Sequence, residues 1–165
     1  MKHFLLVVAV FLVLTSADKP KPKVLIIGDS ISIGYTPFVK EALKDDAIVV
    51  HNKGNAQDTG TGLKRLDEWL GDKKWDVIQF NWGLWDLCYR HPESTVQGHR
   101  DKINGELTTT LENYSKNLEV LVGRLQKTNA KLIFVTTWDV PLTDSGEITD
   151  PFMRQLKLLS NSINT

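Results

Sequence analysis

Short apolar runs alternate with longer amphipathic segments along most of the chain. The runs VLII at 24–27, IVV at 48–50, VIQF at 77–80 and LIFV at 132–135 have the length and side chains of strands. Runs that are apolar without alternation are typical of strands buried on both faces, as in a parallel sheet. The pattern therefore predicts four parallel strands.

The segments between these runs have the spacing of helices. A short helix is expected over 37–43, and a second follows the Gly-Thr-Gly breaker at 60–62. A long helix is expected between the third and fourth strands, and a last one over 152–163. The apolar face of the long helix comprises Leu107, Leu111, Tyr114, Leu118, Leu121, Val122 and Leu125. Strands that alternate with helices predict an α/β fold with the active surface at the carboxyl ends of the strands.

The N-terminus has the pattern of a targeting segment. A basic head, Met-Lys-His, precedes an apolar run over 4–14 and the small residues Thr15 and Ala17. Eleven apolar residues are too few for the roughly 20 that span a bilayer, so we interpret 1–17 as a cleaved secretory signal. An uncleaved membrane anchor is the alternative. We expect a linker over 18–23, a single domain over 24–165, a secreted or periplasmic location and no stable membrane association after cleavage.

Composition narrows the range of functions. The chain has 165 residues, with 20 Lys and Arg against 20 Asp and Glu. Balanced charge without a basic cluster argues against nucleic-acid binding. The sequence contains no phosphate-binding glycine loop and no dinucleotide fingerprint, so no cofactor is expected. His91 and His99 lack the spacing of a metal site, and the lone Cys88 is interpreted as a small buried residue.

The junction after the first strand carries the clearest chemical signal. The run GDSIS at 28–32 places Ser30 where a strand gives way to a helix. Backbone N–H groups and partial positive charge at such a junction suit a serine nucleophile and its developing oxyanion. The alternative is that Asp29 and Ser30 only cap the helix.

These residues resemble the first block of the SGNH, or GDSL, hydrolases. The resemblance implies a three-layer α/β/α, flavodoxin-like fold. Sheets of that kind have five strands, and the sequence shows four, so the fifth strand would be missing. It implies a serine esterase with Ser30 as nucleophile and Asp29 in a supporting position. The Ser30 N–H, a glycine N–H from a second block and an asparagine side chain from a third would form the oxyanion hole.

The second and third blocks match in part. The run NKGNAQDT at 52–59 keeps Asn52 and the turn glycine Gly54, but Gln57 stands where the oxyanion glycine is expected. Its N–H could still serve if its backbone dihedrals are ordinary.

The run GLWD at 83–86 keeps Gly83 and Asp86, but Trp85 stands in place of the asparagine. The indole N–H of Trp85 could serve as the donor. Alternatively, Trp82 and Trp85 are packing or sugar-stacking aromatics.

The final D-x-x-H block, which would supply the general base, is absent from the sequence up to Thr165. Three interpretations stay open: an incomplete domain, a noncatalytic relative, or a displaced histidine such as His51 or His91. We expect a secreted serine esterase that removes small acyl groups, such as acetyl, from a carbohydrate or similar ester. The alternative is a noncatalytic carbohydrate-binding module.

Overall fold

A computed structural model describes residues 19–96 and 99–136. Its centre is a sheet of four parallel strands in the order β2-β1-β3-β6. These strands are β1 (Lys23–Ile27), β2 (Ile48–His51), β3 (Val77–Phe80) and β6 (Lys131–Phe134). Each of the four predicted strands is present, with ends that differ by at most one residue. The predicted parallel sheet is therefore confirmed.

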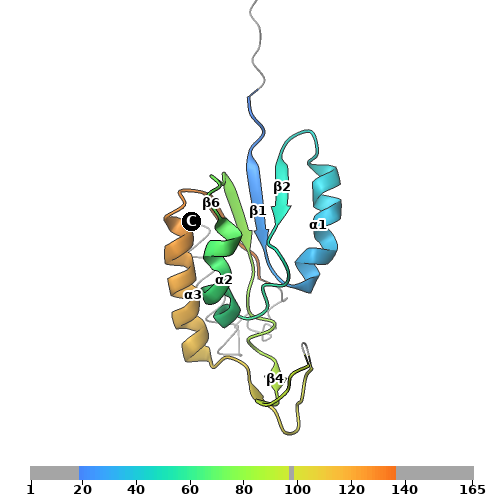
Figure 1. The fold of residues 1–165 in the computed structure, drawn as a ribbon, viewed down its shortest axis with the longest axis vertical. Helices are drawn as coiled ribbons and strands as arrows, with labels where there is room; N and C mark the ends of the chain where they lie inside the picture. The colour runs from blue at the N-terminus through green and yellow to red at the C-terminus, as the bar shows by residue number, and fades with distance from the viewer. Residues whose placement is uncertain (1–18, 97–98, 137–165) are drawn as a thin grey trace, which may run out of the picture.

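Helices cover both faces of this sheet (Figure 1). Helix α1 (Ser30–Ala42) lies on one face, against β1 and β2. Helices α2 (Thr59–Leu70) and α3 (Leu111–Gln126) pack against each other on the opposite face. The arrangement confirms the predicted α/β/α layers. None of the described helices is both long and apolar enough to cross a membrane.

The main core lies between the sheet and the pair α2 and α3. Strand residues such as Leu25, Ile78 and Phe80 face Leu66 from α2 and a stripe of residues from α3. That stripe is Tyr114, Leu118, Leu121 and Leu125, all fully buried and at the spacing that the sequence predicted. At about 25 cal/mol per Å² of apolar surface removed from water, burial of this kind is the main source of stability.

Helix α1 begins at Ser30, so the predicted start at residue 37 is wrong. The side chain of Asp29 caps it by accepting a hydrogen bond from the Ile31 N–H at 3.0 Å. Gly34 and Pro37 interrupt the apolar spacing, and Ile33 is 44% exposed. A helix with apolar side chains facing outward lacks the one-sided pattern on which the prediction depended.

Two smaller features also differ from expectation. Lys23 is the first residue of β1, so the linker predicted over 18–23 ends one residue earlier than expected. A two-stranded antiparallel ladder joins β4 (Tyr89–Arg90) to β5 (Glu106–Leu107). The long helix therefore starts at Leu111 rather than near Leu107. The proposed signal at 1–17 and the helix predicted at 152–163 lie outside the described residues.

Candidate functional site

The carboxyl ends of β1, β2 and β3 bring the three predicted blocks to one edge of the sheet. The Gly28 N–H donates to Asn52 Oδ1 at 2.9 Å, and the Ala56 N–H donates to the Gly28 carbonyl at 3.0 Å. The Asn81 N–H donates to the Ile27 carbonyl at 3.0 Å, which aligns the third block beside the first. Sequence segments up to about 50 residues apart thus form one surface.

Ser30 is the first residue of α1 and is exposed to solvent. The first N–H groups of a helix have no acceptor within the helix, and the helix dipole adds partial positive charge there. Asp29, which is only 3% exposed, is the cap of α1. The capping interpretation is therefore correct for Asp29, while Ser30 is an exposed residue in the first turn of the helix. This position suits a nucleophile.

Asn52 and Gly54 form the support beneath this edge. Asn52 is 4% exposed, and its side-chain nitrogen donates to the Gly54 carbonyl at 3.0 Å. Gly54 has φ of +75°, a conformation that favours glycine, so its interpretation as the turn glycine is confirmed. The oxygen and the nitrogen of this one buried side-chain amide thereby connect the loops after β1 and β2.

Gln57 departs from the expected geometry. Its φ is +50°, so the expectation of ordinary dihedrals is wrong. Its N–H donates to Asn55 Oδ1 at 2.8 Å. The backbone here has the left-handed conformation that glycine adopts freely, and for glutamine this conformation costs roughly 1–2 kcal/mol of free energy. Because Asn55 holds this N–H, Gln57 could serve an oxyanion only after that bond is released.

The third block contains Gly83, with φ of +140°, and the half-buried Trp85. The guanidinium carbon of Arg90 lies 4.3 Å from the centroid of the Trp85 ring. Arg90 therefore covers one face of this ring. Trp82 is only 2% exposed and packs in the core, so of the two interpretations, packing or sugar stacking, packing is the correct one for Trp82.

Asp86 is fully buried and holds the third block against the start of α2. Its carboxylate accepts from the Thr59 hydroxyl at 2.6 Å and from the Thr59 N–H at 3.0 Å. Burial raises the pKa of Asp86, while hydrogen bonds from Thr59 and Thr109 oppose that shift. Asp86 is thus a supporting residue that fixes the backbone next to Trp85.

A similar overall fold occurs in solved structures. An acetyl xylan esterase, AlAXEase, superposes with a TM-score of 0.59 at 18% identity, covering 86% of this chain and 71% of the other. An acetyl-xylooligosaccharide esterase from Geobacillus gives 0.57 at 18%, covering 87% and 74%. A GDSL-like lipase from Bacteroides thetaiotaomicron gives 0.52 at 14%, covering 86% and 61%.

The fold is that of the GDSL-type esterases and lipases. The chain spans less than two thirds of the length of the lipase and about three quarters of the Geobacillus esterase. At these identities the likeness concerns the fold. The sequence matches no protein-family model and no curated protein. Residue roles within this GDSL-type fold therefore depend on the geometry of this chain.

Sequence reasoning missed the contact between Ser32 and His51. The two atoms Ser32 Oγ and His51 Nε2 are 2.7 Å apart, and His51 Nδ1 lies 2.7 Å from the Asn52 carbonyl oxygen. A neutral ring with its proton on Nδ1 donates to Asn52 and leaves Nε2 as an acceptor. The single proton of the Ser32 hydroxyl then goes either to Nε2 or to the Asp29 carbonyl oxygen, which is also 2.7 Å from Ser32 Oγ. Burial lowers the pKa of His51, which favours this neutral form. His51 therefore contacts the buried Ser32, so the structure gives no support to a displaced base for Ser30.

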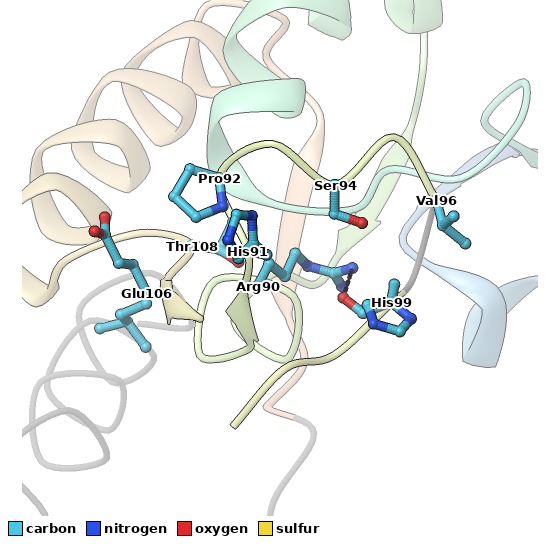
Figure 2. Close-up of a pocket in the computed structure, with 9 residues that line it drawn as sticks. Arg90, His91, Pro92, Ser94, Val96, His99, Glu106 and Thr108 are labelled. Carbon is cyan, nitrogen blue, oxygen red and sulfur yellow. Dashed lines mark hydrogen bonds between the residues drawn. The ribbon is translucent and has the colours of Figure 1, made fainter. Parts of the chain in front are cut away.

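The other two histidines of the described chain line a cavity beyond the third block. Figure 2 shows His91 and His99 with Arg90 between them. This cavity has a volume of about 310 Å³. A neighbouring cavity of about 180 Å³ is lined by Gln57, Trp85 and Arg90. Within 19–96 and 99–136, no cluster of three His, Cys, Asp or Glu side chains is placed to hold a metal ion.

Proposed function

We propose that this chain is a secreted serine esterase that removes small acyl groups, such as acetyl, from carbohydrate esters. The observation that carries this proposal is the exposed Ser30 at the N-terminus of α1, directly after the central strand β1. Two solved proteins of the same fold are esterases of acetylated xylan or xylooligosaccharides by name. The apolar run at 4–14 with its basic head supports secretion.

In the proposed reaction Ser30 Oγ attacks the ester carbonyl carbon, and the alcohol leaves to give an acyl-Ser30 intermediate. Water then attacks the acyl carbon, which releases the carboxylic acid and restores the serine. The Ser30 N–H, in the first turn of α1, is a suitable donor to the oxyanion. The Trp85 indole N–H is a second candidate, since none of the hydrogen bonds among the described residues uses it.

The proton acceptor for Ser30 stays a prediction. The resemblance places it in a D-x-x-H block that the sequence to Thr165 does not contain. His51 is held by Ser32 and Asn52. Support for the esterase proposal therefore comes from the nucleophile and from the backbone around it.

Turnover of a series of 4-nitrophenyl esters by the full-length protein tests this proposal. Acetate is expected to be hydrolysed faster than butyrate, and octanoate slowest. Acetic acid release from acetylated xylooligosaccharides is the companion measurement. Absence of turnover with every ester would contradict the esterase proposal and favour the noncatalytic alternative.

A carbohydrate-binding module without catalysis is the second candidate function. Trp85 and the cavities beside it favour this candidate, because they form a surface that could hold a sugar in the absence of turnover. Under this alternative, Trp85→Ala weakens binding of xylooligosaccharides while no acyl-enzyme forms on Ser30. Detection of acylated Ser30 by mass spectrometry would contradict it.

A further inference from the structure

Arg90 occupies the centre of the surface that adjoins the proposed oxyanion hole. It lines both neighbouring cavities, one with Gln57 and Trp85 and the other with His91 and His99. The cavities also share Ser94, Val96 and Thr108. A group in these cavities lies beside the two positions, 57 and 85, that the resemblance assigns to the oxyanion hole. This is therefore a suitable place for the alcohol part of an ester.

The side chain of Arg90 is held in one orientation before any ligand arrives. Its guanidinium stacks on the Trp85 ring at 4.3 Å, and its Nη1 donates to the His99 carbonyl at 3.3 Å. Figure 2 shows the side chain passing beneath Ser94 toward His99. Stacking on an aromatic face restricts a flexible side chain, so less conformational entropy is lost when it binds.

The positive charge of Arg90 has no acidic partner in the described part of the chain. None of the ion pairs found there includes Arg90. Glu106 lines the same cavity, but its carboxylate points away from the guanidinium (Figure 2). Asp58 lines the other cavity and accepts from the Thr61 N–H at 2.9 Å as the cap of α2. Arg90 is half-buried as a residue, and its guanidinium, with one hydrogen bond, retains donors for a planar anion.

We propose that the substrate is an acylated acidic sugar, whose carboxylate pairs with Arg90 while its hydroxyl groups face Ser94 and His91. The inference rests on the proposed esterase function and names its substrate class. Arg90 blocks one face of Trp85 from stacking on a sugar ring. Charge pairing by a bidentate guanidinium therefore replaces stacking on that face.

Binding of simple glycosides to the full-length protein tests this inference by calorimetry. Methyl glucuronoside is expected to bind at least about tenfold more tightly than methyl glucoside, because a hydrogen bond to a charged group is lost in the neutral sugar. Arg90→Gln should remove this preference. Arg100→Gln is the matched control, since Arg100 is exposed and lines a different cavity.

Two further measurements keep the test independent of folding. The melting temperature of Arg90→Gln shows whether the variant folds, and the preference of the unmodified protein should shrink as NaCl rises. Equal binding of the two glycosides by the unmodified protein would overturn the inference. So would acetate that competes as strongly as the glucuronoside, because the sugar would then contribute nothing.

The same experiments separate this inference from the proposed function. Ser30→Ala should keep the preference for the glucuronoside, since Ser30 lines neither cavity. A protein that hydrolyses acetyl esters without this preference would overturn the inference alone. A protein that has the preference and no esterase activity would overturn the proposed function, and Arg90 would then mark a site that binds an acidic sugar without hydrolysing it.

Discussion

The loops after β1 and β2 differ in construction from the segment after β3. In the first two loops, the buried side chains of Asp29 and Asn52 each hold backbone groups in place. The segment after β3 places Trp85, Arg90 and His91 around open cavities. The difference indicates a fixed support for the nucleophile next to a surface for recognition. Two of the departures from the resemblance, Gln57 and Trp85, line a cavity of that surface.

Replacing the proposed nucleophile should have the largest effect. Ser30→Ala is expected to lower kcat by at least about 10³-fold, because the remaining groups cannot form the acyl-enzyme. The melting temperature should stay unchanged, since the side chain is exposed. Hydrolysis of 4-nitrophenyl acetate and a thermal melt measure both. Ser115→Ala on α3 is the control, and equal activity of the two variants would contradict the role of Ser30.

Breaking the fixed support should mainly affect stability. Asn52→Ala leaves the buried Gly28 N–H without its acceptor, so unfolding should become easier by about 1–3 kcal/mol. Activity should fall as well, because the loop before Ser30 loses its anchor. Urea denaturation measures the change. Asn113→Ala, at an exposed position of α3, should cost less than about 0.5 kcal/mol. Equal losses in the two variants would show that Asn52 is not an anchor.

Gln57 follows β2 and also lines a cavity with Trp85, so a substitution there tests its positive φ where the fixed support meets the recognition surface. Gln57→Gly should stabilise the fold by up to about 1 kcal/mol, because glycine adopts positive φ without steric cost. Asn129→Gly is a matched control at φ of +58°, far from the site in sequence. Both variants should melt at a higher temperature, and only the first should change kcat. A lower melting temperature for Gln57→Gly would contradict the claim that the backbone at Gln57 is strained.

The contact between His51 and Ser32 should produce the smallest effect, visible as a pH dependence. Burial lowers the pKa of His51 in the folded chain, so the unfolded chain takes up this proton more readily. Its contribution to stability is present above about pH 6.5, the unfolded value, and is lost as the pH falls through the folded pKa. Melts of the unmodified protein and His51→Gln between pH 5 and 8 measure the difference. Identical pH profiles of the two proteins would contradict a contribution of His51 to the pH dependence of stability.

The sequence predicts the parts of this fold that depend on local pattern. The strands at 24–27 and 77–80 and the buried face of α3 follow from apolar spacing alone. The start of α1 was missed because Gly34 and Pro37 interrupt that spacing. The β4–β5 ladder was missed because strands of two residues show no periodicity.

The candidate site also has features that follow from the local sequence and features that do not. The places of Ser30, Asp29 and Gly54 at the ends of strands follow from the motif and the apolar runs before it. The contact of His51 with Ser32 joins residues 19 apart, and nothing in the local sequence indicates it. The stacking of Arg90 on Trp85 likewise depends on the path of the chain after β3. Contacts of this kind emerge only from the tertiary structure.

Labelling of the full-length protein with a fluorophosphonate tests the central claim most directly. An activated serine nucleophile reacts with this probe, whereas an ordinary hydroxyl does not. Ser30 and Ser32 lie in the same tryptic peptide, residues 24–40, so fragment-ion sequencing must distinguish them. The account predicts a single adduct on Ser30 that is absent from Ser30→Ala. An adduct on Ser32, or no adduct at all, would contradict the claim that Ser30 is the nucleophile.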